Sequence, residues 1–280
     1  MSTTRRHLLK RVAAMASAVA LPQVHAANQP LRLAIVPQFT AVEIYKSWAP
    51  LATLLEQRCK IRIELAVANS IAAFEQEFLK GNADLVYLNP YHMVMANNNH
   101  GYVPLVRDSS RLLSGILVVR AQDGVSSIAA LAGQQISFPA PNAFGASLYM
   151  RALLARKHGV NINPHYAMTH RNAYRMVLSG ASAAAGGVKA TFQKEDPDVR
   201  EALKVIFETP GVPAHPLAAH PRVNKELRTV MTQTMIELGR DPDKKMLMDG
   251  IQMSSPMAAN YLADYAPLQE LKLEKFVVLE

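Results

Sequence analysis

Short apolar runs and amphipathic stretches alternate along the chain after residue 30. Runs rich in β-branched residues predict buried strands at residues 31–37, 61–67, 83–89, 114–120, 134–140 and 203–209. Apolar residues at helical spacing predict helices at residues 41–57, 70–81, 147–159 and 224–239. This alternation predicts an α/β protein with mainly parallel sheets.

The pattern breaks twice, near residues 120–126 and near residues 209–216. The second break reads "TPGVPAHP", which contains too much proline for a helix or a central strand. A segment bracketed by two breaks predicts one lobe inserted into another. We therefore expect a discontinuous first lobe of residues 27–119 plus 212–280 and an inserted second lobe of residues 120–211. A ligand would lie in the cleft between the lobes.

Residues 1–26 have the pattern of an export signal, with a basic head, an apolar stretch and a small-residue end at Ala26. The apolar stretch is too short to span a bilayer, and no later segment is long enough either. "TTRRHLLK" resembles the twin-arginine export pattern, and the general secretory route is the alternative. These features predict a soluble protein in the periplasm.

Charge and cysteine content narrow the function further. The formal net charge is +8, and removal of Arg5, Arg6, Lys10 and Arg11 with the signal leaves +4. Nucleic-acid binding is disfavoured, because no basic run is interleaved with aromatic residues. A mildly basic body suits a protein that meets anions. The single cysteine, Cys59, excludes an internal disulfide and lies too far downstream for a lipid anchor, so we interpret it as a packing residue rather than a ligand for a soft metal.

An ordered set of segments resembles the phosphonate, phosphite and phosphate substrate-binding proteins of ABC importers. The segments are "LRLAIVPQF", "AFEQEFLKGNADLVYLNPYHMVMA", "GYVPLVRD", "LLSGILVVRAQDGVSSIAALAGQQISFPAP" and "THRNAYRMVLSGASAAAGGVKATF". The resemblance implies a two-lobed type II periplasmic binding fold that closes on its ligand by hinge motion. It further implies no catalysis, no cofactor, a small anion as ligand, an ABC permease in the inner membrane as partner, and a monomer. It places Gln38 and Phe39 among the ligand-binding residues.

The stretch "APNAFGASLYMRALL", residues 140–154, is the first candidate site. As a strand-to-helix turn it would leave the backbone N–H groups of residues 144–147 unpaired at a helix start, where they and the helix dipole bind oxyanions. Gly145 would let an anion approach the backbone closely. The candidate residues are Asn142, Ala143, Phe144, Gly145, Ala146 and Ser147. The alternative is an ordinary helix start capped by Asn142 or Ser147.

One departure from the resembled family falls in this turn. Ala143, Phe144 and Gly145 stand where the family usually has a Ser-Thr-Ser run, so hydroxyl donors are lost while backbone donors remain. Each lost hydrogen bond to a charged ligand is worth about 1.5–3 kcal/mol. Ser147 could compensate from one turn further along. Phe144 predicts an apolar wall that faces a ligand with some hydrocarbon.

Two further segments supply candidates. In "YLNPYHMVMA", Asn89, Tyr91 and His92 follow a strand end, although Asn89 and Pro90 also suit a plain helix cap and first turn, and Met93 replaces a frequent family tyrosine. In the later segment, His170 matches a family histidine. Lys189 stands where aminophosphonate binders tend to carry an aspartate, which predicts a preference for a plain anion over a zwitterion.

Other functions have less support. A hydrolase is disfavoured, because Tyr149 replaces the second glycine of a nucleophile elbow around Ser147. Metal or metalloid capture by the same fold would use Tyr87, Tyr91, His92 and His170, but no clustered Cys, His and Asp spacing supports it. A periplasmic receptor that feeds a membrane sensor kinase or cyclase remains the main alternative to an importer component.

Overall fold

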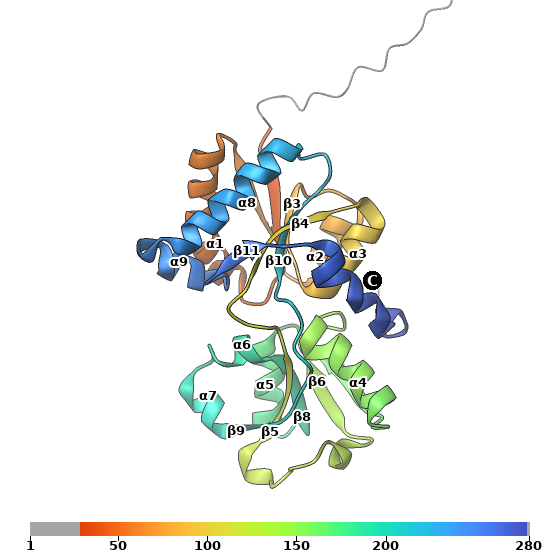
Figure 1. Cartoon of the computed structure of the whole chain (residues 1–280). Coiled ribbons are helices and arrows are strands. Elements are labelled where there is room, and N and C mark those ends of the chain that lie inside the picture. The colour runs from red at the N-terminus through yellow and green to blue at the C-terminus, as the bar shows by residue number, and fades with distance from the viewer. Residues whose placement is uncertain (1–28, 279–280) are drawn as a thin grey trace, which may run out of the picture.

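The computed structural model describes residues 29–278, which form two α/β lobes, each built on one sheet (Figure 1). The predicted export signal at residues 1–26 lies outside the described residues. Within residues 29–278, no helix combines the length and apolar character needed to cross a membrane.

The first lobe has a six-stranded sheet in the order β11-β4-β10-β3-β1-β2. Strand β1 pairs in parallel with β2 and β3, whereas β10 and β11 pair antiparallel with their neighbours. Its strands are β1 (Leu31–Ile35), β2 (Ile63–Val67), β3 (Leu85–Tyr87), β4 (Val103–Asp108), β10 (Pro216–Ala219) and β11 (Pro256–Ala258). Its helices are α1 (Ala41–Cys59), α2 (Ile71–Leu79), α3 (Pro90–His100), α8 (Lys225–Arg240) and α9 (Lys245–Gly250).

The second lobe has a five-stranded sheet in the order β7-β6-β8-β5-β9. Strand β6 pairs in parallel with β7 and β8, and β5 pairs antiparallel with β8 and β9. Its strands are β5 (Gly115–Arg120), β6 (Gln135–Phe138), β7 (Asn163–Tyr166), β8 (Ala184–Val188) and β9 (Leu203–Glu208). Its helices are α4 (Tyr149–Lys157), α5 (His170–Leu178), α6 (Lys189–Phe192) and α7 (Pro197–Ala202).

These sheets correct two details of the sequence prediction. Both sheets are mixed rather than mainly parallel, because the chain enters and leaves the second lobe through strands that run against their neighbours. The chain crosses between the sheets at residues 109–114 and again at residues 209–215, seen as two extended segments in Figure 1. The first crossing precedes β5, so a boundary after residue 119 would cut through that strand.

Local signals explain where the main helices of the first lobe begin. Thr40 forms a capping box with Glu43 at the start of α1, and Ser70 caps α2 by accepting from the Ala73 N–H. Helix α1 then buries an apolar stripe of Ile44, Trp48, Leu51, Ala52 and Leu55. Cys59 at its end packs partly buried against the same core, and burial raises the pKa of its thiol. This environment agrees with a packing role.

Glycines let a turn of the second lobe lie directly on its sheet. The turn Phe144–Leu148 precedes α4 and packs over β5 and β8. A Cβ at Gly115 would overlap the Gly145 carbonyl, and a Cβ at Gly186 would overlap the Ala146 carbonyl. The small residues in the stretch 181–187 therefore leave room for this turn to pack directly on the sheet.

We expect Gly186→Ala to destabilise the protein by about 1–3 kcal/mol, because the added methyl group has no room beneath the turn. Urea unfolding followed by circular dichroism measures the change. Gly250→Ala is the control, because its added methyl group meets nothing within 4 Å, and its free energy of unfolding should stay within about 0.5 kcal/mol of the unaltered protein. Gly124→Ala is less suitable, because Gly124 has φ 69°, which disfavours any side chain. Equal stability of the two variants would contradict the packing argument.

The C-terminal part of the chain forms a third connection between the lobes. Residues 266–278 leave the first lobe and lie beside α4 of the second, as the dark blue end in Figure 1 shows. Arg151 of α4 donates to the Phe276 carbonyl (2.7 Å), and Arg156 donates to the Leu271 carbonyl (2.7 Å). We call residues 266–278 the C-terminal strap.

Candidate ligand-binding site

A small cavity of about 290 Å³, including its open mouth, lies between the lobes, and we call it the central cavity. Both lobes and both crossings contribute to its walls. Its lining residues are Val36, Gln38, Ile71, Asn89, Leu113, Ala143, Phe144, Gly145, His170, Val188 and His215. No lysine, arginine or carboxylate is among the described residues that line it.

The turn after β6 brings backbone donors to this cavity. Residues 144–148 form one turn of π-helix directly before α4, in which the Leu148 N–H donates to the Ala143 carbonyl (3.2 Å). Within the described part of the chain, the N–H groups of Phe144, Gly145 and Ala146 have no hydrogen-bond acceptor. These three donors lie at the positive end of the turn and α4. Unpaired N–H groups at the positive end of a helix are groups to which an oxyanion can bind.

Two residues predicted for this turn have other partners. The Ser147 N–H donates to the Ala143 carbonyl (2.7 Å), and the buried Ser147 hydroxyl accepts from Arg151 Nε (3.1 Å). Asn142 does not cap the helix, because its side chain donates to Glu75 of the first lobe (3.1 Å) and pairs with the Val278 backbone of the strap. The turn therefore offers backbone N–H groups of residues 144–146 rather than of residues 144–147.

Two histidines line the central cavity. His170, the first residue of α5, is buried, and its Nδ1 has no hydrogen-bond partner among the described residues. Burial lowers the pKa of His170 to about 4. Burial, with the nearby His92, Arg111 and His170, lowers the pKa of His215 to about 3. Both rings are therefore neutral near pH 7 and can donate one hydrogen bond each.

The segment after β3 contributes less than its sequence predicts. Asn89 caps α3, since its Oδ1 accepts from the His92 N–H (2.7 Å), and Pro90 occupies the first turn. Asn89 also lines the central cavity. Tyr91 lies behind the cavity wall, where its ring stacks on Phe144 with centroids 6.4 Å apart, and burial raises its pKa to about 12. His92 is fully buried, and its Nε2 lies 2.8 Å from the Glu75 carboxylate.

The structure therefore does not bring His92 or Tyr91 to the cavity. The helical rotation after Asn89 instead turns His92 toward Glu75 in the first lobe and Tyr91 toward Phe144 of the second lobe. Met93 is also fully buried in that core.

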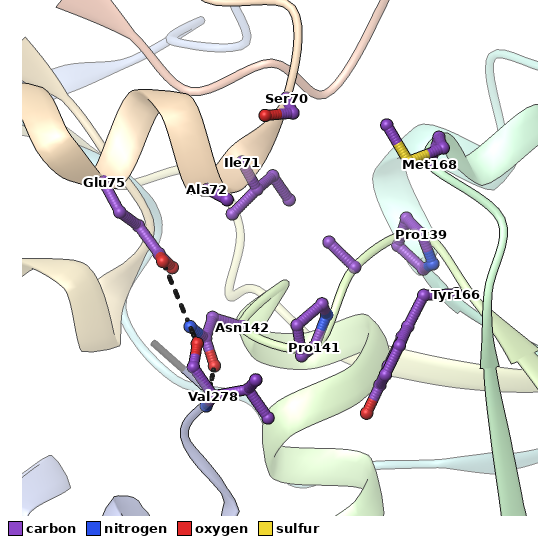
Figure 2. Close-up of a pocket in the computed structure, with 11 residues that line it drawn as sticks. Ser70, Ile71, Ala72, Glu75, Pro139, Pro141, Asn142, Tyr166, Met168 and Val278 are labelled. Carbon is purple, nitrogen blue, oxygen red and sulfur yellow. Dashed lines mark hydrogen bonds between the residues drawn. The ribbon is translucent and has the colours of Figure 1, made fainter. Parts of the chain in front are cut away.

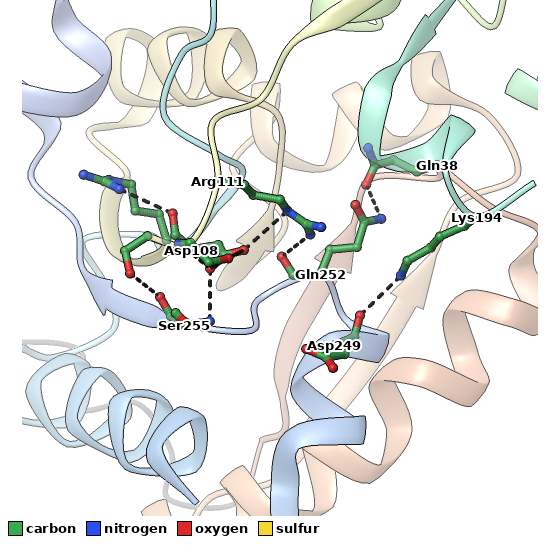
Figure 3. Close-up of polar contacts among 10 residues, drawn as sticks. Gln38, Asp108, Arg111, Lys194, Asp249, Gln252 and Ser255 are labelled. Carbon is green, nitrogen blue, oxygen red and sulfur yellow. Dashed lines mark hydrogen bonds and ion pairs between the residues drawn. The ribbon is translucent and has the colours of Figure 1, made fainter. Parts of the chain in front are cut away.

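A chain of polar contacts stands beside the central cavity (Figure 3). Gln38 accepts from the Gln252 side chain (3.3 Å), and Gln252 offers its carbonyl to Arg111 (3.0 Å). Arg111 is also held by Asp108 (3.4 Å). Arg111 lines an adjoining cavity that shares Leu113, Val188 and His215 with the central one. It is thus a cation close to the site, although the sequence analysis did not identify it.

Phe39 is not among the residues that line the central cavity. The ammonium of Lys194 is 5.8 Å from its ring centroid, and the same lysine donates to the Asp249 carbonyl (3.3 Å). These contacts join the segment after α6 of the second lobe to the loop before α1 and to α9 of the first lobe.

Lys189 is outside the central cavity and forms an ion pair with Glu208 (2.8 Å). Glu208 also accepts from the Ser114 hydroxyl (2.6 Å), and these contacts lower the pKa of Glu208. The ammonium of Lys189 is therefore neutralised by Glu208 close to the two crossings. With its charge paired there, Lys189 gives no reason to expect a preference for a plain anion over a zwitterion.

We expect Lys189→Ala to change phosphate affinity by less than about threefold, because half-exposed ion pairs contribute little and the ammonium does not reach the cavity. Isothermal titration calorimetry measures the affinity. A loss of tenfold or more would show that Lys189 contacts the ligand after the lobes close.

The fold and cavity can be compared with known proteins. The family described as "ABC transporter, phosphonate, periplasmic substrate-binding protein" matches residues 33–265. The chain belongs to this family. It is therefore the solute-binding component of an ABC importer, a class of transport protein rather than of enzymes, and its partners are a small molecule and a membrane permease.

Relatives in this phosphonate-binding family share the fold at low sequence identity. The "Phosphate-import protein PhnD" of Mycolicibacterium smegmatis is 23% identical over 228 residues, which span 72% of this chain and 71% of that protein. A binding protein component of an ABC phosphonate transporter from Pseudomonas aeruginosa superposes with a TM-score of 0.78 at 15% identity, covering 88% of this chain and 86% of the other. PhnD1 from Prochlorococcus marinus in complex with methylphosphonate gives a TM-score of 0.76 at 17% identity, covering 88% and 98%. The predicted two-lobed type II periplasmic binding fold is thus confirmed.

Proposed function

We propose that this family member captures a small tetrahedral oxyanion of the phosphate, phosphite or phosphonate class in the central cavity. The observation that carries the proposal is the set of unpaired N–H groups at residues 144–146, of which Phe144 and Gly145 line the cavity, together with the unpartnered Nδ1 of His170, another lining residue. Backbone donors and neutral imidazoles can stabilise an anion without a cation in the site. The names of the relatives, which refer to phosphate import and methylphosphonate, support the same class of ligand.

The proposal extends to the cycle of transport. Export by the twin-arginine or general secretory route would place a monomer in the periplasm, and hinge closure about residues 109–114 and 209–215 would enclose the anion for delivery to the permease. Asn89 and Gln38 line the cavity from the first lobe, so ligand contacts would come from both lobes.

Calorimetry with phosphate, phosphite, methylphosphonate, 2-aminoethylphosphonate, sulfate and arginine tests the ligand class. We expect the tightest ligand of this panel to be phosphate, phosphite or methylphosphonate. The aminophosphonate should bind more weakly, because no carboxylate lines the central cavity. Tightest binding of arginine, or no binding by any phosphorus oxyanion, would overturn the assignment.

A further inference from the structure

Arg151, the third residue of α4, contacts both the turn after β6 and the C-terminal strap, but it does not line the central cavity. Its Nε donates to the Ser147 hydroxyl (3.1 Å), and one terminal nitrogen donates to the Pro141 carbonyl (2.9 Å). The same nitrogen donates to the Phe276 carbonyl of the strap (2.7 Å). The guanidinium carbon lies 5.9 Å from the centre of the Tyr166 ring. One partly buried side chain thus joins the turn, the strap and β7.

Two of these contacts lie at opposite ends of the unpaired donors. The Pro141 carbonyl precedes the N–H groups of residues 144–146, and the Ser147 hydroxyl follows them. The segment between them includes a turn of π-helix, which is a rare conformation. A guanidinium presents its donors in a rigid planar fork, so it fixes the separation of the two ends that it binds. Arg151 is therefore placed to hold the three donors in one geometry.

The positive charge of Arg151 has no carboxylate partner within residues 29–278. Its acceptors are one hydroxyl and two carbonyls, all of them neutral. Burial lowers the pKa of the guanidinium, which still stays protonated at neutral pH. A partly buried cation without a counter-charge costs stability. An anion bound at the turn would place a negative charge close to this cation, so the charge of Arg151 favours the occupied site.

The strap also reaches the turn through the residue that follows Pro141. Asn142 donates to the Glu75 carboxylate of α2 (3.1 Å) and forms two hydrogen bonds with the Val278 backbone (2.6 and 3.0 Å), as Figure 2 shows. The strap therefore meets the beginning of the turn at two points, through Arg151 and through Asn142. These contacts restrict movement of the segment that carries the donors.

We propose that Arg151 is a positioning residue for oxyanion binding, because its guanidinium ties Pro141 to Ser147 and so directs the three N–H groups between them at one anion. Arg151 does this without touching the ligand. The inference rests on the proposed function of this turn.

Calorimetry with phosphate and methylphosphonate on three variants tests the proposal. Arg151→Met keeps much of the hydrocarbon and removes the donors, and it should weaken binding about tenfold or more, the order of loss when groups that orient metal ligands are removed. Arg156→Met is the matched control on the same helix, because Arg156 donates to the Leu271 carbonyl of the strap and not to the turn. Its affinity should stay within about twofold, since exposed polar contacts contribute little. Arg151→Lys keeps the charge without the planar fork and should recover only part of the affinity.

A spectroscopic measurement separates positioning from stability. Saturating phosphate should move the amide proton resonances of residues 144–146 downfield in the unaltered protein and in Arg156→Met, because these N–H groups gain a charged acceptor. The downfield shifts should be smaller in Arg151→Met at saturating phosphate. Urea unfolding shows whether each variant is folded, and Arg151→Lys serves for the same comparison if Arg151→Met does not fold.

The outcomes distinguish the role of Arg151 from the proposed function. Unchanged affinity in Arg151→Met, equal losses in Arg151→Met and Arg156→Met, or full recovery by Arg151→Lys would overturn the positioning role. If the unaltered protein bound neither phosphate, phosphite nor methylphosphonate, the proposed function would be wrong. Hydrogen exchange of the Ser147 and Leu148 N–H groups, which donate to the Ala143 carbonyl, would then decide the role of Arg151. Faster exchange in Arg151→Met than in Arg156→Met would support its hold on the turn, and equal exchange would overturn it.

Discussion

Glu75→Ala is expected to lower the free energy of unfolding by about 3–5 kcal/mol. The Glu75 carboxylate is only 2% exposed, and it accepts from the fully buried His92 ring (2.8 Å) and from Asn142 of the other lobe (3.1 Å). Its removal leaves the His92 imidazole buried without this partner and takes one of two acceptors from the Asn142 amide. Urea unfolding followed by circular dichroism measures the loss.

Two further variants make this test specific. Glu64→Ala removes an exposed carboxylate from Arg32 and should cost less than about 1 kcal/mol. The double variant Glu75→Leu with His92→Leu replaces the polar pair by apolar groups, and it should be more stable than the sum of the single changes predicts. A Glu75→Ala variant as stable as Glu64→Ala would contradict the buried network.

His170→Phe is expected to weaken binding of the oxyanion by about 1.5–3 kcal/mol, or about tenfold to more than a hundredfold. The change keeps an aromatic ring at the start of α5 and removes the unpartnered Nδ1 of a residue that lines the central cavity. His170→Gln, whose amide can donate, should recover part of the affinity. His220→Phe alters a histidine outside the central cavity and should leave affinity unchanged.

Stability against pH gives a second measurement on the same residue. The pKa of His170 falls from 6.5 to about 4 on folding, so the unfolded chain binds the proton more readily between those values. The free energy of unfolding should therefore decrease as pH falls from about 6.5 toward 4, and the decrease should be smaller in His170→Phe. If the unaltered protein and His170→Phe had identical stability profiles against pH and identical oxyanion affinities, His170 would not be a ligand-binding residue.

The sequence predicted the fold where side chains carry the signal. Runs rich in valine, isoleucine and leucine correspond to β1, β2, β3, β5, β6 and β9. Strand β8 reads "AAGGV" and was not predicted, because its small residues are selected for contact with the turn above them and not for strand propensity. Strand β10 begins at Pro216, in a segment that we interpreted only as a break.

Some residues of the candidate site could likewise be predicted from local sequence, whereas others could not. The donor turn at residues 144–146 could be predicted from a strand-turn-helix motif, because backbone donors depend on local structure. His215 lies in the proline-rich second crossing and reaches the cavity only through tertiary folding. The partner of Lys189 is Glu208 on a neighbouring segment of the second lobe, and no local pattern identifies that pairing.

The C-terminal strap changes the mechanics of opening. Two crossings alone would leave the lobes free to bend and to twist about each other. Hydrogen bonds from Arg151 and Arg156 to the strap add a third anchor at the flank of the molecule. If those bonds held while the lobes opened, relative motion would be confined to rotation about an axis through the crossings and the strap, and a single angle would describe the opening.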